Sequence, residues 1–437
     1  MSTPGAAVAS PRLRVLFVNR YYAPDMSGTS QMLTDLAEGL ARSGIEVSVV
    51  CGRQLYENPE AALPPHEVIR GVRVWRVRTA RFGRGKLSGR VLDYATFYFS
   101  ATLALLQHTR HCDVIVTKTD PPLLSLIGSF VARRRGVVCI NWLQDIYPEI
   151  ASRLSLSPLP RALESRLAAW RDRSLTAAAT NVVLGARMRD YLVSRGVPPE
   201  RISVGENWAD EGTISRLPVA ASVLRQRLEL ADRFVVAYSG NLGRAHDMET
   251  LLAAAQALRD DPGTVFLLTG SGANMRALET VARQQQLAQM LFLPYQPRVQ
   301  LTDSLAAGDV HLVTLRPQLE GLIVPSKLYG ILAAGRPVVF IGDPAGELAQ
   351  LIGERRIGFS VACGDGAELC RALRSLRDDP AERERMGARA RALFEERYTL
   401  AGALARWRSL LAHAAERLQS QSTIASGAGP FRSNSHS

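Results

Sequence analysis

Short apolar runs alternate with segments of helical periodicity along most of the chain. Residues 12–19 (RLRVLFVN) form a β-branched, mostly apolar run, and a loop with proline and glycine separates them from residues 29–43, where apolar positions recur at helical spacing. Gly44 ends that segment, and residues 46–50 predict the next strand. An opening of strand, glycine loop, helix and strand is typical of a parallel sheet covered by helices.

The same alternation is predicted to build two domains. Further strands are predicted at 114–117, 137–143, 181–184, 233–239, 264–269, 291–293, 310–315 and 338–341. A polar stretch at 206–215 interrupts the series, which begins again behind it. We therefore predict an α/β protein with two Rossmann-like domains, residues 11–205 and 219–399.

The end of the chain follows a different pattern. A last helix is predicted over residues 400–418, where it would pack back on the first domain. Residues 419–437 (QSQSTIASGAGPFRSNSHS) are polar and rich in glycine, so we expect them to be disordered.

Composition bounds the class of protein. With 437 residues, 46% of them hydrophobic, the chain can bury two cores of ordinary size. Five dispersed cysteines and an N-terminus without a signal-peptide pattern favour a reducing, cytoplasmic setting. No uninterrupted apolar run reaches the roughly 20 residues of a membrane-spanning helix. The formal net charge of +12 calls for an anionic partner: nucleic acid, phospholipid or a phosphorylated substrate.

Several catalytic patterns are missing from the sequence. No spacing resembles a zinc site, no D-x-D is present that could hold a divalent cation on a diphosphate, and no G-x-S-x-G elbow occurs. We therefore expect neither a metal ion nor another cofactor. Nucleic acid is disfavoured as the partner, because no recognised binding module accompanies the charge.

Glycine-containing loops follow predicted strands in both domains. They lie at residues 27–29, 240–246, 270–272 and 325–327, and free N–H groups at a helix start form a ready phosphate site. The last three loops belong to one predicted sheet, so they converge at one edge. Arg244, His246 and Lys327 can neutralise a diphosphate there, because permanent cations can replace a metal. The alternatives are a tight turn at Ser27-Gly28 and a solvated Lys327.

Four segments carry a family resemblance: residues 141–149 (NWLQDIYPE), 238–252 (YSGNLGRAHDMETLL), 267–279 (LLTGSGANMRALE) and 294–347 (PYQP to GDPAGE). Together they resemble glycosyltransferase family 4, and in particular the branch that builds O-antigen and colanic-acid-type polysaccharides. The resemblance extends from residue 12 to about residue 418. It implies a GT-B fold, in which two Rossmann-like domains face each other across a cleft, and metal-independent transfer with retention of anomeric configuration.

The implied function is sugar transfer in surface glycan biosynthesis. The donor would be a UDP- or GDP-sugar, carrying for example an N-acetylated amino sugar or a fucose-type sugar, and it would bind mainly to the C-terminal domain. The acceptor would be a lipid-linked glycan or a polysaccharide, held by the N-terminal domain.

The resemblance also assigns residues to the donor. Ser27-Gly28 matches the first-domain loop that approaches the donor phosphates, although relatives often have two glycines there. Asn241 and His246 stand where the family usually has an arginine and a lysine, so Arg244 and Lys327 are expected to contact the phosphates. Tyr295 and Gln296 should border the base. The full donor-binding set is Ser27, Gly28, Gly240, Asn241, Arg244, His246, Gly270, Gly272, Tyr295, Gln296, Ser326 and Lys327.

One motif of the family is absent. Many relatives have a ribose-binding glutamate at the position of Gly330, and Glu320 precedes Gly330 by ten positions. The usual spacing of glutamate, seven residues and glutamate is therefore missing, and ribose must be bound otherwise. Glu320 remains the candidate for the donor-sugar hydroxyls, with an ordinary loop charge as the alternative.

Two aspartates of the first domain follow predicted strands. Retaining transfer without a metal needs a diphosphate stabilised by cations and amides, and an acceptor hydroxyl held on the leaving-group face. Asp145 is the candidate catalytic residue that orients the acceptor, with a helix N-cap as the alternative. Asp120 is a candidate acceptor residue.

Basic residues crowd one stretch of the first domain. Between Arg70 and Arg90 there are eight lysines and arginines and no acid, and an apolar, aromatic helical segment follows. This combination suits the anionic inner face of a cell membrane, which would make the protein peripheral to it. The alternative is a solvated face beside a helix that packs on the sheet.

Three other functions compete with sugar transfer. A UDP-sugar 2-epimerase shares the two-domain fold and would change the donor without an acceptor. A non-catalytic, membrane-docked subunit is suggested by Gly330 and would bind the donor without turnover. A dinucleotide oxidoreductase fits worst, because residues 47–52 end the second strand without an acid to hold a ribose.

Overall fold

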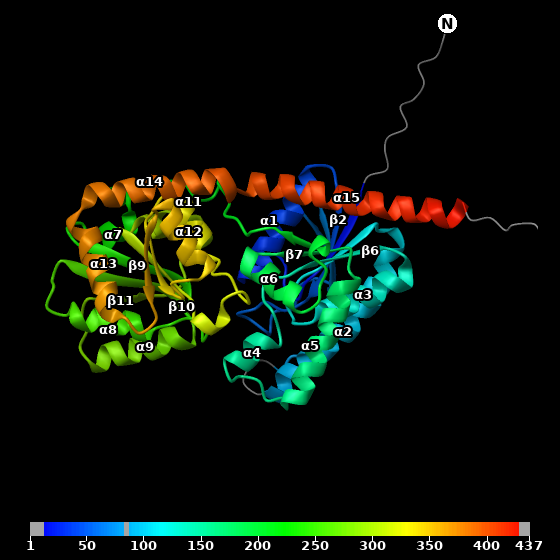
Figure 1. Cartoon of the computed structure of the whole chain (residues 1–437), viewed down its shortest axis with the longest axis horizontal. Coiled ribbons are helices and arrows are strands. Elements are labelled where there is room, and N and C mark those ends of the chain that lie inside the picture. The colour runs from blue at the N-terminus through cyan, green and yellow to red at the C-terminus, as the bar shows by residue number, and fades with distance from the viewer. Residues whose placement is uncertain (1–12, 83–86, 428–437) are drawn as a thin grey trace, which may run out of the picture.

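The structure is a computed structural model that describes residues 13–82 and 87–427. It contains two α/β lobes that lie side by side, with the last helices of the chain running along one side of both (Figure 1). Each lobe has a sheet of its own. The predicted class, an α/β protein with two Rossmann-like domains, is confirmed.

The first sheet has eight strands in the order β3-β4-β2-β1-β5-β6-β7-β8. All neighbours pair in parallel except β3 and β4, which are antiparallel. The strands are β1 Arg14–Val18, β2 Glu46–Gly52, β3 His66–Ile69, β4 Val72–Val77, β5 Val114–Thr117, β6 Val138–Trp142, β7 Thr180–Val183 and β8 Ile202–Val204. Successive strands are added on one side of β1 up to β4 and on its other side from β5 onward. The loops that follow β1 and β5 therefore lead to opposite faces of the sheet and leave room for a site between them.

Helices cover both faces of the first sheet. They are α1 Gly28–Arg42, α2 Leu87–His108, α3 Leu124–Arg135, α4 Glu149–Arg153, α5 Arg161–Ala177 and α6 Ala186–Ser194. One core cluster packs α1 and the last helix against one face, and another packs α2 and α3 against the other. Strands such as β5 and β6 are buried along their whole length, which explains their continuous apolar runs.

The second sheet has six parallel strands in the order β11-β10-β9-β12-β13-β14. They are β9 Phe234–Asn241, β10 Thr264–Ser271, β11 Met290–Leu293, β12 Val310–Thr314, β13 Val338–Gly342 and β14 Gly358–Ala362. The helices are α7 Val223–Arg227, α8 Glu249–Ala257, α9 Ala273–Gln284, α10 Leu301–Ala306, α11 Lys327–Ala333, α12 Glu347–Arg355, α13 Gly366–Asp378 and α14 Pro380–Arg397.

The two domains share a core. One cluster of buried residues joins Ile146 and Met188 of the first domain to Leu322 and Leu328 of the second. The last helix, α15 (Leu400–Gly427), packs through Trp407 and its neighbours on the core of the first sheet. Trp407 lies edge-on to the ring of Trp142, 4.9 Å away.

One element is longer than predicted. Helix α15 continues to Gly427 rather than ending at residue 418, and residues 428–437 lie outside the described part. No proline interrupts this stretch, and extending a formed helix costs little per residue. The first part of the Arg70–Arg90 run forms strand β4.

Candidate active site

The two domains meet at the carboxyl ends of their strands. After β6, the N–H of Ile146 donates to the carbonyl of Leu322 at 3.0 Å, and Asp145 forms an antiparallel bridge with Ile323. Residues 322 and 323 belong to the loop that leads into α11. The backbone therefore fixes Asp145 beside the segment that presents Lys327.

Lys327 begins α11 and lies among groups of two other strand ends. Its Nζ lies 3.3 Å from Nε2 of His246 and 5.1 Å from the ring centre of Tyr238. Burial lowers the pKa of Lys327 to about 8. A largely desolvated ammonium of this kind interacts strongly with an anion, because little water screens it.

His246 does not have the predicted role of a cation. Its Nδ1 lies 2.6 Å from the carbonyl of Thr314 and donates to it, which leaves Nε2 as the acceptor for Lys327. Burial, and then the charge of Lys327, lower the pKa of His246 to about 3. The imidazole is therefore neutral at physiological pH and orients the lysine.

Three predicted glycines allow two loops to touch. Gly240, Gly270 and Gly272 all have positive φ, and a Cβ on Gly270 would lie 2.2 Å from the carbonyl oxygen of Gly240. A Cβ on Gly240 would lie 2.8 Å from Cε of Lys327. Only glycine fits positions where backbones approach this closely.

The start of α9 is not fully free to bind a phosphate. The N–H groups of Asn274 and Met275 both donate to the carbonyl of Leu242, at 3.0 and 3.3 Å. Asn241 is exposed and its side chain lies close to Gly272. The loops at 240 and 272 thus use some of their backbone hydrogen-bonding groups to bond each other.

Two arginines accompany Lys327. Arg244 is exposed, and no hydrogen bond or ion pair is seen for it among the described residues. Arg316 follows β12, its N–H donates to the carbonyl of Ala245 at 2.9 Å, and its buried Nε has no hydrogen-bond partner in the described part. Arg316 is therefore a cation with an unpaired donor beside the 240–246 loop.

The residues predicted near the base and the sugar phosphates lie at the rim of this domain. Tyr295 is 45% exposed, and its hydroxyl is hydrogen-bonded to Ser271, the last residue of β10. Gln296 bonds the carbonyl of Pro294 at 3.0 Å. Ser326 is exposed, precedes α11 and makes no capping bond.

Ser27 and Gly28 stand at the start of α1. The N–H and Oγ of Ser27 donate to Oδ1 of Asp25, at 2.8 and 2.5 Å, so Ser27 does not cap the helix. A Cβ on Gly28 would meet nothing within 4 Å. The first N–H groups of α1 are consequently open to an anionic group such as a phosphate.

Asp145 has the properties of a reactive carboxylate. It is half-buried, and burial, followed by the charge of Asp120, raises its pKa to about 6. No hydrogen bond to its carboxylate is seen among the described residues, and the alternative role as a helix N-cap is wrong, because Pro148 precedes α4. A partner-free carboxylate with a raised pKa in a domain junction is a candidate functional group.

Lys118 lies at the same junction and is a candidate that sequence analysis missed. It follows β5, is 1% exposed, donates to the carbonyl of Thr29 at 2.9 Å and lies 3.8 Å from the ring centre of Trp142. Burial lowers its pKa to about 7, against the opposing pull of Asp120 and Asp145. The only sequence signal was a lysine directly after a buried strand, which by itself does not reveal burial.

Glu320 is engaged in a chain of helix caps. Its Oε1 accepts from the N–H of Glu347 at 2.8 Å, and the carboxylate of Glu347 accepts from the N–H groups of Ala186 and Arg187 at 2.8 and 3.0 Å. Glu320 lines a cavity of ≈ 210 Å³ formed by both domains. One of its oxygens remains for a ligand, and its part in sugar binding stays a prediction.

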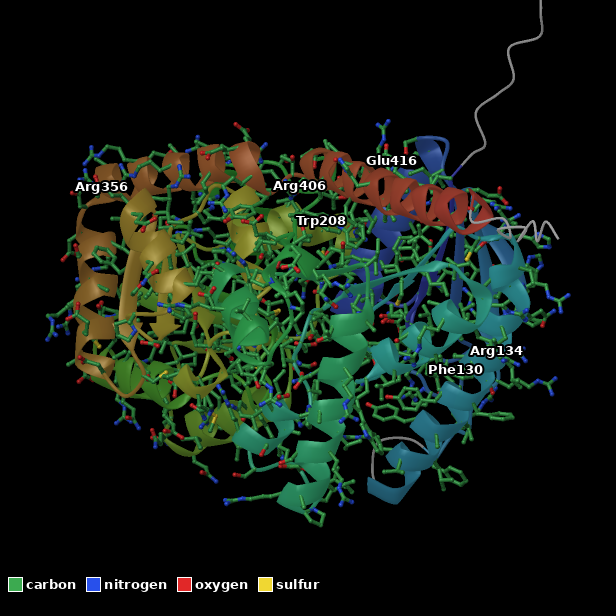
Figure 2. All side chains as sticks on the ribbon, turned by 45° about the vertical axis from the view of Figure 1, so that its right-hand side comes forward. Phe130, Arg134, Trp208, Arg356, Arg406 and Glu416 are labelled. Carbon is green, nitrogen blue, oxygen red and sulfur yellow. The ribbon has the colours of Figure 1, made fainter. Side chains whose placement is uncertain are left out.

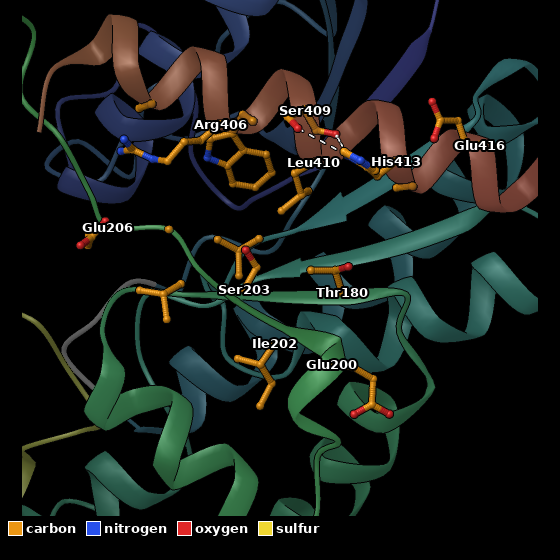
Figure 3. A pocket seen from close by; sticks show the side chains of 16 residues that line it. Thr180, Glu200, Ile202, Ser203, Glu206, Arg406, Ser409, Leu410, His413 and Glu416 are labelled. Carbon is orange, nitrogen blue, oxygen red and sulfur yellow. Dashed lines mark hydrogen bonds between the residues drawn. The ribbon is translucent and has the colours of Figure 1, made fainter. Parts of the chain in front are cut away.

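A larger hollow lies away from these residues. A groove of ≈ 1050 Å³ runs between α15 and strands β7 and β8 (Figure 3). None of the predicted site residues lines it. Within the described residues, no group of three histidines, cysteines or acids that could hold a metal ion is found. No described helix is long and apolar enough to cross a membrane.

The arrangement separates two kinds of chemistry. The second domain presents three cations, Arg244, Arg316 and Lys327, around paired glycine loops. The first domain presents the carboxylates of Asp120 and Asp145 above the buried Lys118, together with the open start of α1. Such a site can hold a phosphorylated ligand on one side and orient a hydroxyl group on the other.

Comparison with known proteins begins with two family profiles. Residues 27–208 match the glycosyl transferase 4-like domain, and residues 222–393 match glycosyl transferases group 1. The colanic acid biosynthesis glycosyl transferase WcaI of Escherichia coli K12 is 27% identical over 78% of this chain and 86% of that protein. The glycosyltransferase WbjE of Pseudomonas aeruginosa is 26% identical over 67% of this chain and 73% of its own.

Solved structures share the architecture. HepE of Anabaena, determined in complex with UDP, superposes with a TM-score of 0.69 at 17% identity, covering 92% of this chain and all of that one. WaaG, a glycosyltransferase involved in lipopolysaccharide biosynthesis, superposes with a TM-score of 0.65 at 17% identity, over 92% of this chain and 99% of its own. At these identities the likeness concerns the fold.

Proposed function

Because this chain belongs to the group 1 glycosyltransferases, family 4, and has their GT-B fold, we propose that it transfers a sugar from a UDP- or GDP-sugar to a lipid-linked or polysaccharide acceptor in surface glycan biosynthesis. HepE is seen with UDP and with UDP-glucose, and a relative from Mycobacterium tuberculosis, 25% identical, is a GDP-mannose-dependent alpha-mannosyltransferase. These relatives support both nucleotides. WcaI and WbjE support the surface-glycan setting.

One observation carries the proposal: the backbone bond from Ile146 to Leu322 places Asp145 beside the loop of Lys327. The group expected to orient the acceptor is thereby held beside the loop that leads to the cation expected to receive the diphosphate. Holding both reactants in attacking geometry removes much of the entropic barrier to a transfer between them.

The proposed reaction retains anomeric configuration and uses no metal. The bond from the sugar C1 to the diphosphate breaks while the acceptor oxygen bonds to C1 on the same face, and the hydroxyl proton passes to the departing phosphate oxygen. Lys327, Arg316 and Arg244 stabilise the charge that develops on the diphosphate. Asp145 accepts a hydrogen bond from the acceptor hydroxyl and so fixes its direction of approach.

A donor panel tests the function directly. The protein is incubated with cell membranes and radiolabelled UDP- and GDP-sugars, and we expect label from one donor to enter lipid-extractable or polymeric material. Label that returns as a changed nucleotide sugar, without an acceptor, would instead identify an epimerase. Donor binding without any turnover over the whole panel would support the non-catalytic subunit.

The absence of a metal is tested in the same assay. We expect transfer to survive excess EDTA, because arginine, lysine and helix N–H groups take the place of a cation on the diphosphate. Loss of transfer on chelation, with recovery on addition of manganese, would show that the metal-free mechanism is wrong.

A further inference from the structure

The outer side of α2 carries an apolar stripe. Val91, Ala95, Phe99 and Leu103 follow one another at intervals of four residues and therefore lie on one side of the helix. Val91, Phe99 and Leu103 are 58%, 69% and 52% exposed. A single exposed apolar residue is ordinary, whereas a row of them along a helix marks an interaction surface.

Two neighbouring helices extend this surface. Helix α3 packs between α2 and α5. It presents Phe130, which is 49% exposed, and Figure 2 shows Phe130 and Arg134 on the outside of the first domain. On α5, Leu163 and Trp170 are 38% and 49% exposed. We call the outward sides of these three helices the α2–α3–α5 face.

Charge on this face has one sign. Within residues 89–177, every charged side chain in the exposed class is an arginine. On α3 and α5 these are Arg133, Arg134, Arg135, Arg161, Arg166 and Arg173. Of the acids in the same stretch, Asp93 and Asp172 are buried, at 3% and 8% exposed, and the others, including Glu164 of α5, are half-buried. Apolar side chains framed by exposed arginines fit the head groups and upper acyl chains of an anionic bilayer.

The Arg70–Arg90 run is a weaker docking surface than its sequence indicates. Arg70 pairs with Glu38 at 3.0 Å, and Arg73 and Arg76 pair with Glu46 and Glu67. Arg84 and Lys86 lie outside the described residues. Three of the eight charges are thus already neutralised within the protein.

The opposite side of α2 leads to the proposed acceptor residues. Asp93 of α2 lies 3.9 Å from the guanidinium of Arg20, which also lies 4.9 Å from the ring centre of Tyr94. The N–H of Arg20 donates to the carbonyl of Asp120 at 2.6 Å. One helix therefore connects the α2–α3–α5 face to the side of the junction that holds Asp120.

We propose that the α2–α3–α5 face docks on an anionic phospholipid surface, with the apolar stripe of α2 inserted among the lipids. The docking itself is independent of the proposed function. Only its role, which is to bring a lipid-linked acceptor to Asp120 and Asp145, rests on that function. A second copy of the chain is a poor occupant, because a twofold contact through this face would set arginine against arginine.

Vesicle sedimentation tests the face with three variants. Arg133→Glu with Arg134→Glu reverses charge on α3, and Phe99→Ser with Leu103→Ser removes apolar groups from α2. Arg276→Glu with Arg374→Glu is the matched control, because both arginines are exposed on the other domain. The vesicles contain phosphatidylcholine alone or with phosphatidylglycerol.

We expect wild type and control to sediment with the phosphatidylglycerol vesicles and to release as salt rises. The Arg133/Arg134 variant should bind on the order of 30-fold more weakly, since each basic residue near an anionic leaflet contributes about 1 kcal/mol. The Phe99/Leu103 variant should bind at least about tenfold more weakly. Nucleotide binding, measured without vesicles, should be equal in all variants, so failure of docking and failure of the proposed function are seen separately.

Two outcomes would overturn the proposal. One is that both face variants sediment with the phosphatidylglycerol vesicles to the same extent as the wild type. The other is release by Arg81→Glu with Arg84→Glu and Lys86→Glu alone, which would return docking to the basic run. Self-association of the wild type that the face variants abolish, without vesicle binding, would identify a second copy as the occupant and equally overturn it.

Discussion

The two sides of the domain junction obtain their chemistry in different ways. On the second domain, Lys327 is held by His246, which is held by the carbonyl of Thr314, and the glycines at 240 and 270 allow these loops to meet. On the first domain, Asp145 has a raised pKa and no hydrogen-bond partner among the described residues. The donor side is preorganised by local contacts, whereas the acceptor side is made reactive by burial.

Removing the preorganised cation should have the largest effect on turnover. We expect Lys327→Ala to lower kcat by about 100-fold, the usual cost of losing one positioned group that stabilises developing negative charge. The effect should lie in kcat more than in KM for the donor, because the charge grows in the transition state. Steady-state kinetics with a fixed acceptor measure both.

The matched control keeps the charge. Lys327→Arg should recover part of the rate, although a planar guanidinium cannot take the same place beside His246. Near-normal turnover of Lys327→Ala would remove this residue from the site and would leave Arg316 as the principal cation of the second domain.

The burial of Asp145 should be visible in the pH dependence of kcat. Burial raises its pKa to about 6, and the carboxylate form is the one that accepts a hydrogen bond, so kcat should fall as pH drops through about 6. In Asp145→Asn we expect kcat to be about tenfold lower and this limb of the profile to vanish.

The same variant separates function from folding. Because burial disfavours the charged form of Asp145, the carboxylate destabilises the folded protein above pH 6, and Asp145→Asn should raise the free energy of unfolding there by ~1 kcal/mol. Below about pH 4 the carboxyl is protonated in folded and unfolded chains, so the gain should disappear. A variant that is less active and less stable at pH 8 would show that Asp145 is a structural residue.

His246 sharpens the comparison from the donor side. Its pKa of about 3 leaves it neutral at physiological pH, so His246→Ala should lower kcat only about fivefold, through looser positioning of Lys327. The ratio of variant to wild-type rate should stay constant from pH 6 to pH 8. A ratio that changes around pH 6.5 would mean that His246 acts as a cation after all.

The parts of the site that could be predicted from the sequence are those that local motifs define. The glycine loops, the lysine of P-S-K and the aspartates after strands could be predicted, because strand ends of one parallel sheet gather at one edge. The packed environment of Lys118 and the use of Glu320 as a cap for α12 could not, because both depend on residues more than 20 positions away. The ion pairs of Arg70 with Glu38 and of Arg73 with Glu46 were hidden for the same reason.

The smallest effect is expected at Gly330, where the family motif and the packing of the structure lead to different expectations. From the motif, Gly330 stands where relatives have a ribose-binding glutamate. In the structure Gly330 lies within α11 without positive φ, and a Cβ would meet only Leu305 and Ile214, at ordinary distances of 3.6 and 3.8 Å. Packing therefore does not require glycine, which is costly inside a helix.

Gly330→Ala should accordingly raise the free energy of unfolding by ~0.5–1 kcal/mol, because alanine favours the helix and restricts the unfolded chain. Thermal unfolding should shift upward by about 1–3 °C. The KM for the donor should be unchanged, since the added methyl group would face Leu305 and Ile214. A raised KM with unchanged stability would mean that the bare backbone at 330 approaches the donor itself, and the motif would then describe this position better than its packing does.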